Sequence, residues 1–263
     1  MPRVIPILCG FILVAYCAYE SAVSLRKYRR LKRDLAGGDG RARSRFYNEI
    51  LFFEWMSAIL ALGALQFDLT RFNPTHLQIG DTAFGRWWTS AWAHMDSGFL
   101  AGAAIGIAFS VIGAIVGVRL ARQRAARTPQ SQQPSVWSNI LPDFRALVPV
   151  TPQERIRFAL VALSAGVCEE IVYRAWLLDA LHGVGLSGAI LVASASILFG
   201  LGHYYQGYAG ILITSLVGLV LCGLYVASGT LLVPIIVHAL IDLRLSIFPN
   251  LCVATEQNVP SSS

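Results

Sequence analysis

Seven apolar runs of membrane-spanning length constrain this chain more than any other feature. They fall near residues 4–23, 50–67, 99–120, 158–181, 187–202, 211–227 and 231–248. A bilayer core about 30 Å thick needs about 20 apolar residues of α-helix. Hydrophobic residues make up 55% of the 263-residue sequence, which is more than a water-soluble fold would bury. We therefore predict an all-α fold, a polytopic membrane helix bundle with about seven transmembrane helices.

The positive charge is concentrated in two segments, residues 26–45 and 119–127. Two predicted spans separate them, so both segments lie on one side of the membrane, and the positive-inside rule makes that side cytoplasmic. The N-terminus is then outside and the C-terminus cytoplasmic. This placement explains the net charge of +6 without a nucleic acid partner. The short loops favour an integral protein of a bacterial cytoplasmic membrane, with the lipid bilayer as its surroundings.

Four regions follow from the spacing of the runs. We predict N-terminal transmembrane helices over residues 1–127, without an assigned function, and a cytoplasmic linker over 128–150. A four-helix transmembrane core follows over 151–248, and residues 249–263 form a tail. Between the second and third spans, Arg86, Trp87, Trp88 and Trp92 predict a short interfacial helix, because tryptophan and arginine favour the headgroup region.

The fourth span has a clear beginning and an unusual middle. Thr151, Pro152 and Glu154 match a capping box with proline in the first turn, so a helix is expected from Thr151 to about Leu181. Glu169 and Glu170 then lie near its centre, where an acidic residue costs about 2.5 to 3.5 kcal/mol. Intramembrane carboxylates mark functional sites by default.

The two carboxylates have different partners, because successive helical residues point about 100° apart. Glu170 and Arg174 stand four residues apart, which favours an ion pair. Glu169 has no cation on its own helix face. We therefore expect Glu170 to be structural and Glu169 to be free for chemistry as a general base.

Two histidines in later spans extend the pattern. His203 follows Phe199 by four residues, and Asp242 follows His238 by the same interval. Each pair therefore shares a helix face. A carboxylate one turn from His238 is suited to fix the orientation of its ring.

Three motifs together resemble a known family. Cys-Glu-Glu-Ile-Val-Tyr-Arg ends at Arg174, Phe-Gly-Leu-Gly-His ends at His203, and His-Ala-Leu-Ile-Asp ends at Asp242. They are similar to the E-E-x-x-x-R, F-x-x-x-H and H-x-x-x-(N/D) motifs of CPBP intramembrane proteases, which include CAAX prenyl endopeptidases and the bacterial Abi proteins. The resemblance covers residues 151–248.

This resemblance implies hydrolysis of a peptide bond in a membrane-embedded or lipid-anchored substrate, prenylated or not. Glu169 and His203 would activate water, and His238 and Asp242 would stabilise the oxyanion. Glu170, Arg174 and Phe199 would shape the site. The prenyl endopeptidases resemble one another in having asparagine at the position of Asp242. An ionised aspartate cannot donate a hydrogen bond, so Asp242 is either protonated, or orients His238, or holds a metal.

The sequence leaves open whether the activity depends on a metal ion. We expect no cofactor, but Glu169, His203, His238 and Asp242 are suitable zinc ligands, and zinc would also activate water. The zincin motif H-E-x-x-H is absent. A zinc-dependent variant of the protease is therefore the alternative.

Other classes also remain as alternatives. Gly-Leu-Ser-Gly at residues 185–188 matches the G-x-S-G of rhomboid proteases, although Ser187 is expected to cap the next helix instead. Cys168 is expected to pack in the apolar core. A catalytically inactive scaffold or immunity protein of the same family, and a transporter with a carboxylate proton relay, are the functions outside proteolysis.

Overall fold

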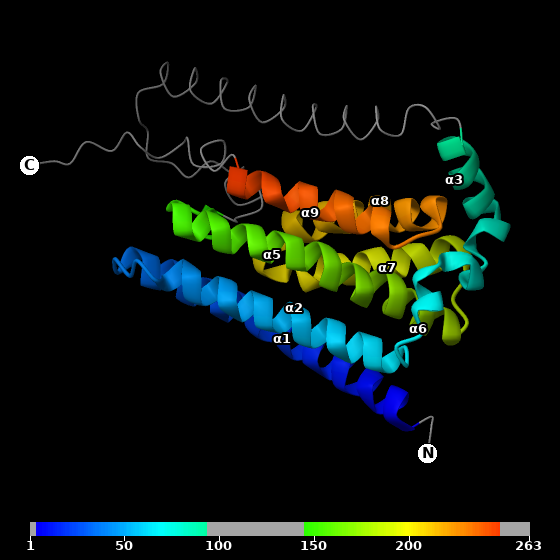
Figure 1. Ribbon diagram of the computed structural model, residues 1–263, viewed down its shortest axis with the longest axis horizontal. Helices are drawn as coiled ribbons and strands as arrows, with labels where there is room; N and C mark the ends of the chain where they lie inside the picture. Colours follow the sequence, from blue (N-terminus) through cyan, green and yellow to red (C-terminus); the bar gives the residue numbers. More distant parts are fainter. Residues whose placement is uncertain (1–3, 94–144, 248–263) are drawn as a thin grey trace, which may run out of the picture.

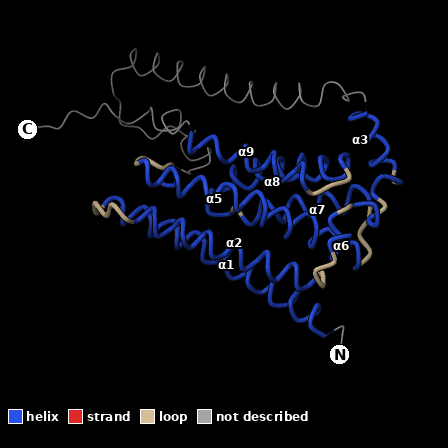
Figure 2. The backbone as a smooth tube through the Cα atoms, viewed as in Figure 1, coloured by secondary structure: helices blue, strands red, loops and turns tan. Residues whose placement is uncertain are grey.

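The computed structural model describes residues 4–93 and 145–247, and every regular element in them is helical (Figures 1 and 2). The long α-helices are α1 (Val4–Ala36), α2 (Ala42–Ala64), α3 (Ala83–Ala93), α5 (Pro152–Glu170), α7 (Gly188–Gly202), α8 (Gly207–Ser228) and α9 (Leu232–Ile247). Shorter helical segments are η1 (Leu69–Phe72), η2 (Pro74–Leu77), η3 (Ile79–Asp81), η5 (Arg145–Leu147), η6 (Ile171–Leu177), α6 (Leu178–Gly183) and η7 (Tyr204–Gln206). The all-α prediction is confirmed for this part of the chain. The predicted span 99–120, most of the linker and the tail lie outside it.

The long helices lie side by side in one bundle (Figure 1). The most extensive packing joins α1 to α2, α5 to α9, and α7 to α8, and α2 also packs along α5. The two N-terminal helices therefore cover one side of the four-helix region formed by α5, α7, α8 and α9.

The first helix is longer than the sequence suggested. We expected a basic loop from residue 26, but α1 continues to Ala36, and only residues 37–41 connect it to α2. Lysine, arginine and leucine are good helix formers. Tyr28 and Leu31 are also buried against the N-terminal parts of α2 and α5. Tertiary packing thus extends the helix beyond the apolar run.

The predicted start of α5 is present. The Thr151 side chain accepts a hydrogen bond from the Glu154 backbone N–H, and the Glu154 carboxylate accepts from the backbone N–H of Thr151. These contacts satisfy donors that every helix N-terminus leaves free. The capping box fixes where the helix that carries both carboxylates begins.

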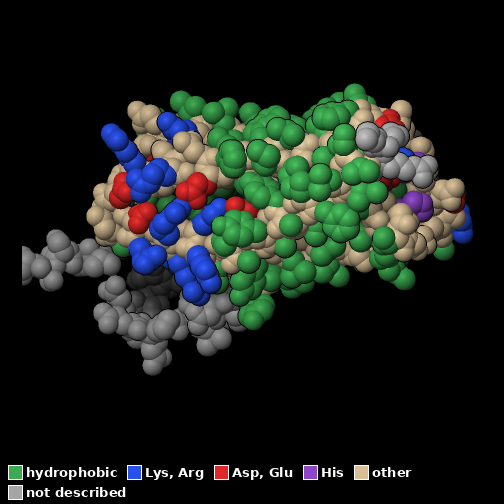
Figure 3. Space-filling model, turned by 90° about the horizontal axis from the view of Figure 1, so that it is seen from below, with side chains coloured by type: hydrophobic (Ala, Val, Ile, Leu, Met, Phe, Trp, Pro, Cys, Tyr) green, Lys and Arg blue, Asp and Glu red, His purple; other side chains and the backbone are tan. Residues whose placement is uncertain are grey.

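The outer surface of the bundle is typical of a membrane protein. Figure 3 shows a broad hydrophobic belt, with lysine and arginine gathered at one end of the bundle. Large apolar side chains such as Phe11, Ile190 and Tyr208 are exposed. Within the described residues, α1 and the segment Tyr204–Ser228 are long and apolar enough to span a membrane, and Gly188–Gly202 is apolar but shorter. The count of seven spans stays a prediction.

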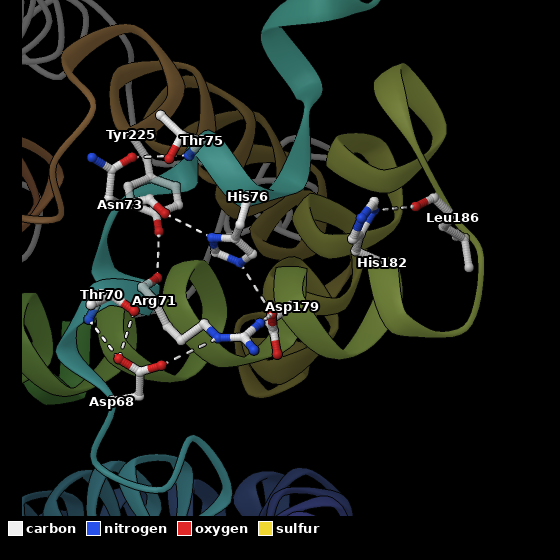
Figure 4. A network of polar contacts seen from close by, with 10 residues as sticks. All are labelled: Asp68, Thr70, Arg71, Asn73, Thr75, His76, Asp179, His182, Leu186 and Tyr225. Atoms are coloured by element: carbon white, nitrogen blue, oxygen red, sulfur yellow. Dashed lines mark hydrogen bonds and ion pairs between the residues drawn. The ribbon is translucent and has the colours of Figure 1, made fainter.

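A polar network secures the connection between α2 and α3 at the other end of the bundle (Figure 4). The Oδ1 atom of Asp179, in α6, lies 2.5 Å from Nη1 of Arg71 and 3.1 Å from Nε2 of His76. The Tyr225 hydroxyl, from α8, donates to the carbonyl oxygen of Arg71 at 3.1 Å. These contacts hold η1 and η2 against the core helices. The segment 68–98 does contain a helix, α3, as expected; an interfacial position for it stays a prediction.

Candidate active site

The site forms where α5 and α9 approach most closely. A Cβ atom on Gly166 would lie 2.8 Å from the Cβ of Ala239 and 2.9 Å from the carbonyl oxygen of Ile235. Only glycine allows this approach. It places the carboxylates at the end of α5 beside His238 on α9.

The helix changes its geometry directly after the two carboxylates. The expected helix from Thr151 to about Leu181 is present, because helical structure runs from Pro152 to Gly183, but Ile171–Leu177 within it is a π-helix. A π-helix widens each turn, and such segments are frequent at functional sites. Arg174 lies inside it and is almost completely buried. The predicted extent of the helix is therefore confirmed, and its local widening is a feature that the sequence did not indicate.

Glu170 is the centre of a buried polar cluster. Its Oε1 accepts from Nη1 of Arg174 at 2.9 Å and lies 2.7 Å from Nδ1 of His238. The expected pair with Arg174 is present. Arg174 also donates to the carbonyl oxygen of Gly218 at 3.2 Å, and its guanidinium lies 4.7 Å from the ring centre of Phe199. One ion pair thereby joins η6, α7, α8 and α9.

The orientation of His238 is set by Glu170, not by the carboxylate one turn away. With Nδ1 bound to Glu170, the Nε2 atom points toward the other two carboxylates, 3.8 Å from Oε2 of Glu169 and 3.7 Å from Oδ2 of Asp242. These distances exceed a direct hydrogen bond. Of these side chains, Glu170 is fully buried, His238 is 6% exposed, Glu169 22% and Asp242 37%. Glu169 and Asp242 are thus the accessible carboxylates of the site.

Phe199 connects the two histidines. His203 is the C-cap of α7, and its Nδ1 lies 3.0 Å from the carbonyl oxygen of Phe199. The Phe199 ring centre is 4.9 Å from that of His203 and 5.9 Å from that of His238. No ion pair joins His203 directly to Glu169 in the described residues. The two side chains instead line one cavity.

This cavity, of about 140 Å³, lies between α1, α2, α5 and the segment after α7. Its lining includes Cys17, Glu20, Glu54, Glu169, Tyr173 and His203. The volume accommodates several water molecules. Sequence reasoning assigned no function to the N-terminal helices, yet α1 and α2 provide part of the wall. A charged residue within the run 50–67, Glu54, was the available signal.

The zinc alternative stays a prediction. In residues 4–93 and 145–247, no three or more His, Cys, Asp or Glu side chains are grouped so that they could hold a metal ion. Zinc needs ligands at about 2.0–2.3 Å in tetrahedral directions. The Nδ1 atom of His238 contacts Glu170, and its Nε2 atom is directed at Glu169 and Asp242.

The positions of Ser187 and Cys168 do not support either residue as a catalytic nucleophile. Ser187 is at the N-cap of α7, where its side chain makes no capping hydrogen bond, contrary to expectation. At 1.5 Å per residue, it lies about 18 Å along α7 from Phe199, which contacts His238. Ser187 and His238 therefore cannot form a dyad. Cys168 is buried, as expected, although it borders the cavity.

The fold and the site together define a helical membrane protein with a carboxylate–histidine centre inside the bundle. Residues 151–244 match the family model of type II CAAX prenyl endopeptidase Rce1-like proteins. The resemblance expected from the three motifs is thereby confirmed for this segment, and the family is one of proteases. No curated protein and no solved structure gave a significant match.

Proposed function

We propose that the protein is an intramembrane endopeptidase that cleaves a membrane-embedded or lipid-anchored peptide with water activated by Glu169 and His203. One observation carries this proposal: Oε2 of Glu169 is buried without a hydrogen-bond partner in the described structure, and the Glu169 residue borders the cavity that His203 also lines. A carboxylate placed in this way is available to accept a proton.

The catalytic sequence needs only groups of this chain and water. Glu169 accepts a proton from a water molecule held between Glu169 and His203, and the water oxygen attacks the carbonyl carbon of the scissile bond. The carbonyl π bond breaks and leaves an oxyanion. Glu169 then gives its proton to the amide nitrogen. The oxyanion re-forms the carbonyl π bond as the C–N bond breaks and its electron pair leaves with the nitrogen, so that an acid and an amine are released.

His238 is suited to stabilise the oxyanion. Its Nδ1–H is donated to Glu170, so Nε2 donates to the substrate when the ring carries its second proton. Glu169, Glu170 and Asp242 surround this ring and balance the positive charge of its doubly protonated form. A preorganised donor in a site of low polarity is worth about 10²–10³ in kcat. Asp242, 3.7 Å from the same Nε2, would donate to the oxyanion beside His238 when its carboxyl is protonated.

The basic end of the bundle would face the cytoplasm of a bacterial cell. The lysine and arginine side chains at this end (Figure 3) come from α1, α2 and the start of α5, and the positive-inside rule places them there. The N-terminus is then outside. A fluorescent-protein fusion after residue 263, which fluoresces only in the cytoplasm, tests this orientation.

Substrate accumulation tests the activity itself. Membrane proteomes of cells producing the wild-type protein, Glu169→Gln, His203→Ala or the control Asp34→Asn are compared for uncleaved peptides. Asp34 lies near the C-terminal end of α1, at the basic end of the bundle. We expect one or more membrane proteins to accumulate uncleaved with both site variants and to be processed with the control. Equal processing by all four proteins would instead favour the inactive scaffold.

A further inference from the structure

Glu54 of α2 is a buried carboxylate outside the segment that matches the protease family. Its side chain lies in the cavity wall, and the residue is 3% exposed. Oε2 has no hydrogen-bond partner in the described structure, and no described cation lies within ion-pair distance. A buried carboxylate without a partner is destabilising, so its retention requires a reason.

The other carboxylates that α1 and α2 contribute to the cavity are neutralised. Glu20 lies 2.7 Å from Nζ of Lys27, and Glu49 lies 2.5 Å from Nη2 of Arg30. Lys27, the lysine of the cavity lining, is therefore already paired. Glu54 and Glu169 are left without a lysine or arginine partner in the part of the chain that is described, and acidic side chains outnumber basic ones in the cavity lining.

The position of Glu54 along the cavity follows from two side-chain contacts between α2 and α5. Arg157 donates to Asn48, and Trp55 donates to Ser164, each at 3.1 Å. In both pairs the α5 residue is 109 positions after the α2 residue. The two helices therefore run in the same direction, and Glu54 is level with residue 163. Glu169 is six residues further along, which corresponds to about 9 Å. An extended peptide spans this distance with about three residues.

We propose that Glu54 binds a cationic group of the ligand in this cavity, and that this group is a Lys or Arg side chain within about three residues of the scissile bond. The identity of the ligand as a peptide substrate rests on the proposed function. A substrate cation provides the charge partner that the folded protein itself lacks. The carboxylate in turn offsets the free energy that the cation loses when it leaves water and enters the membrane.

A thiol-labelling experiment tests Glu54 without requiring catalysis. Cys17 lines the same cavity and is left as the single thiol after Cys9→Ser, Cys168→Ala, Cys222→Ala and Cys252→Ser. The purified protein in lipid nanodiscs reacts with a cationic trimethylammonium-ethyl or an anionic sulfonatoethyl methanethiosulfonate. The ratio of the two rates is divided by the ratio for free cysteine in solution.

We expect this normalised ratio to favour the cationic reagent by roughly tenfold or more, because a buried negative charge attracts the cation and repels the anion. Glu54→Gln should lower it at least about threefold. The control Asp34→Asn, which removes the same charge at a position of α1 outside the cavity lining, should leave it unchanged. Absence of a cation preference, or a preference that survives Glu54→Gln, would overturn the assignment.

Internally quenched peptides then test whether the cation belongs to the substrate. They carry Lys, Leu or Glu at each position within three residues of the cleaved bond. We expect a higher kcat/KM for Lys than for Leu, lost in Glu54→Gln while cleavage of the Leu peptide continues. Cleavage without a charge preference would overturn this inference alone. If no peptide is cleaved, the proposed function fails, and the labelling ratio still decides whether Glu54 binds cations.

Discussion

The imidazole of His238 and the carboxylate of Glu170 are in direct contact, with 2.7 Å between Nδ1 and Oε1. The same oxygen accepts from Arg174 at 2.9 Å. Glu170 is therefore more than a counter-ion within its own helix, because it also holds the histidine of α9 in one orientation. This relationship leaves Nε2 as the ring atom that faces Glu169 and Asp242.

The buried ion pair is expected to matter for stability. Arg174→Met should lower the free energy of unfolding by about 3–5 kcal/mol, because it leaves a buried carboxylate short of a partner. The double variant Glu170→Gln/Arg174→Met should be less destabilised than Arg174→Met, since paired groups are not additive. Denaturation in detergent micelles measures both. A double variant as unstable as the sum of the single variants would contradict this.

The close crossing of α5 and α9 is expected to control activity. Gly166→Ala introduces a Cβ that meets Ala239 and the backbone of Ile235, so the helices must separate. We expect a loss of about 1–3 kcal/mol in stability and a loss of activity that can reach about 10²-fold if the site shifts by 1 Å. Gly183→Ala is the matched control, because nothing lies within 4 Å of its added Cβ. Equal activity of both variants would argue against the role of this crossing.

Asp242 can be tested with two substitutions. Asp242→Asn should keep kcat/KM within about threefold of wild type, because an amide is able to donate to the oxyanion. Asp242→Leu, which neither donates nor carries charge, should lose about 10²-fold. Steady-state kinetics with a cleavable peptide measure kcat/KM for both variants. A severe loss in Asp242→Asn would show that the negative charge itself is required.

Metal dependence can be tested directly. Since no described group of side chains is arranged to hold a metal ion, we expect cleavage to persist after treatment with 1,10-phenanthroline and EDTA. Elemental analysis of the purified protein should find far less than one zinc per chain. Inactivation by chelator with recovery on adding zinc would establish the alternative mechanism.

Much of this architecture is visible in local sequence patterns. The capping box at Thr151 and the spacing of Glu170 and Arg174 are interactions between residues three or four positions apart, and both are present. Such contacts depend on the geometry of a single helix. The basic continuation of α1 was missed, because burial of Tyr28 and Leu31 against other helices overrides what an apolar run alone indicates.

The candidate site depends on contacts that no local pattern contains. The π-helix after Glu170, the contact between Glu170 and His238, and the position of Glu54 in the cavity wall each involve residues from separate helices or a local change of helical geometry. Sequence spacing favoured Asp242 as the partner that orients His238, yet Glu170, 68 residues away in the chain, takes that place.

The apolar runs and helix signals are enough to specify an all-helical membrane protein and the residue types at its centre, because a bilayer forces backbone hydrogen bonds to form within each segment. Which carboxylate faces which histidine is decided only when the helices pack. A charge buried in a membrane protein takes its partner from whichever helix lies nearest in space, and here Gly166 sets that distance by admitting α9 to the face of α5.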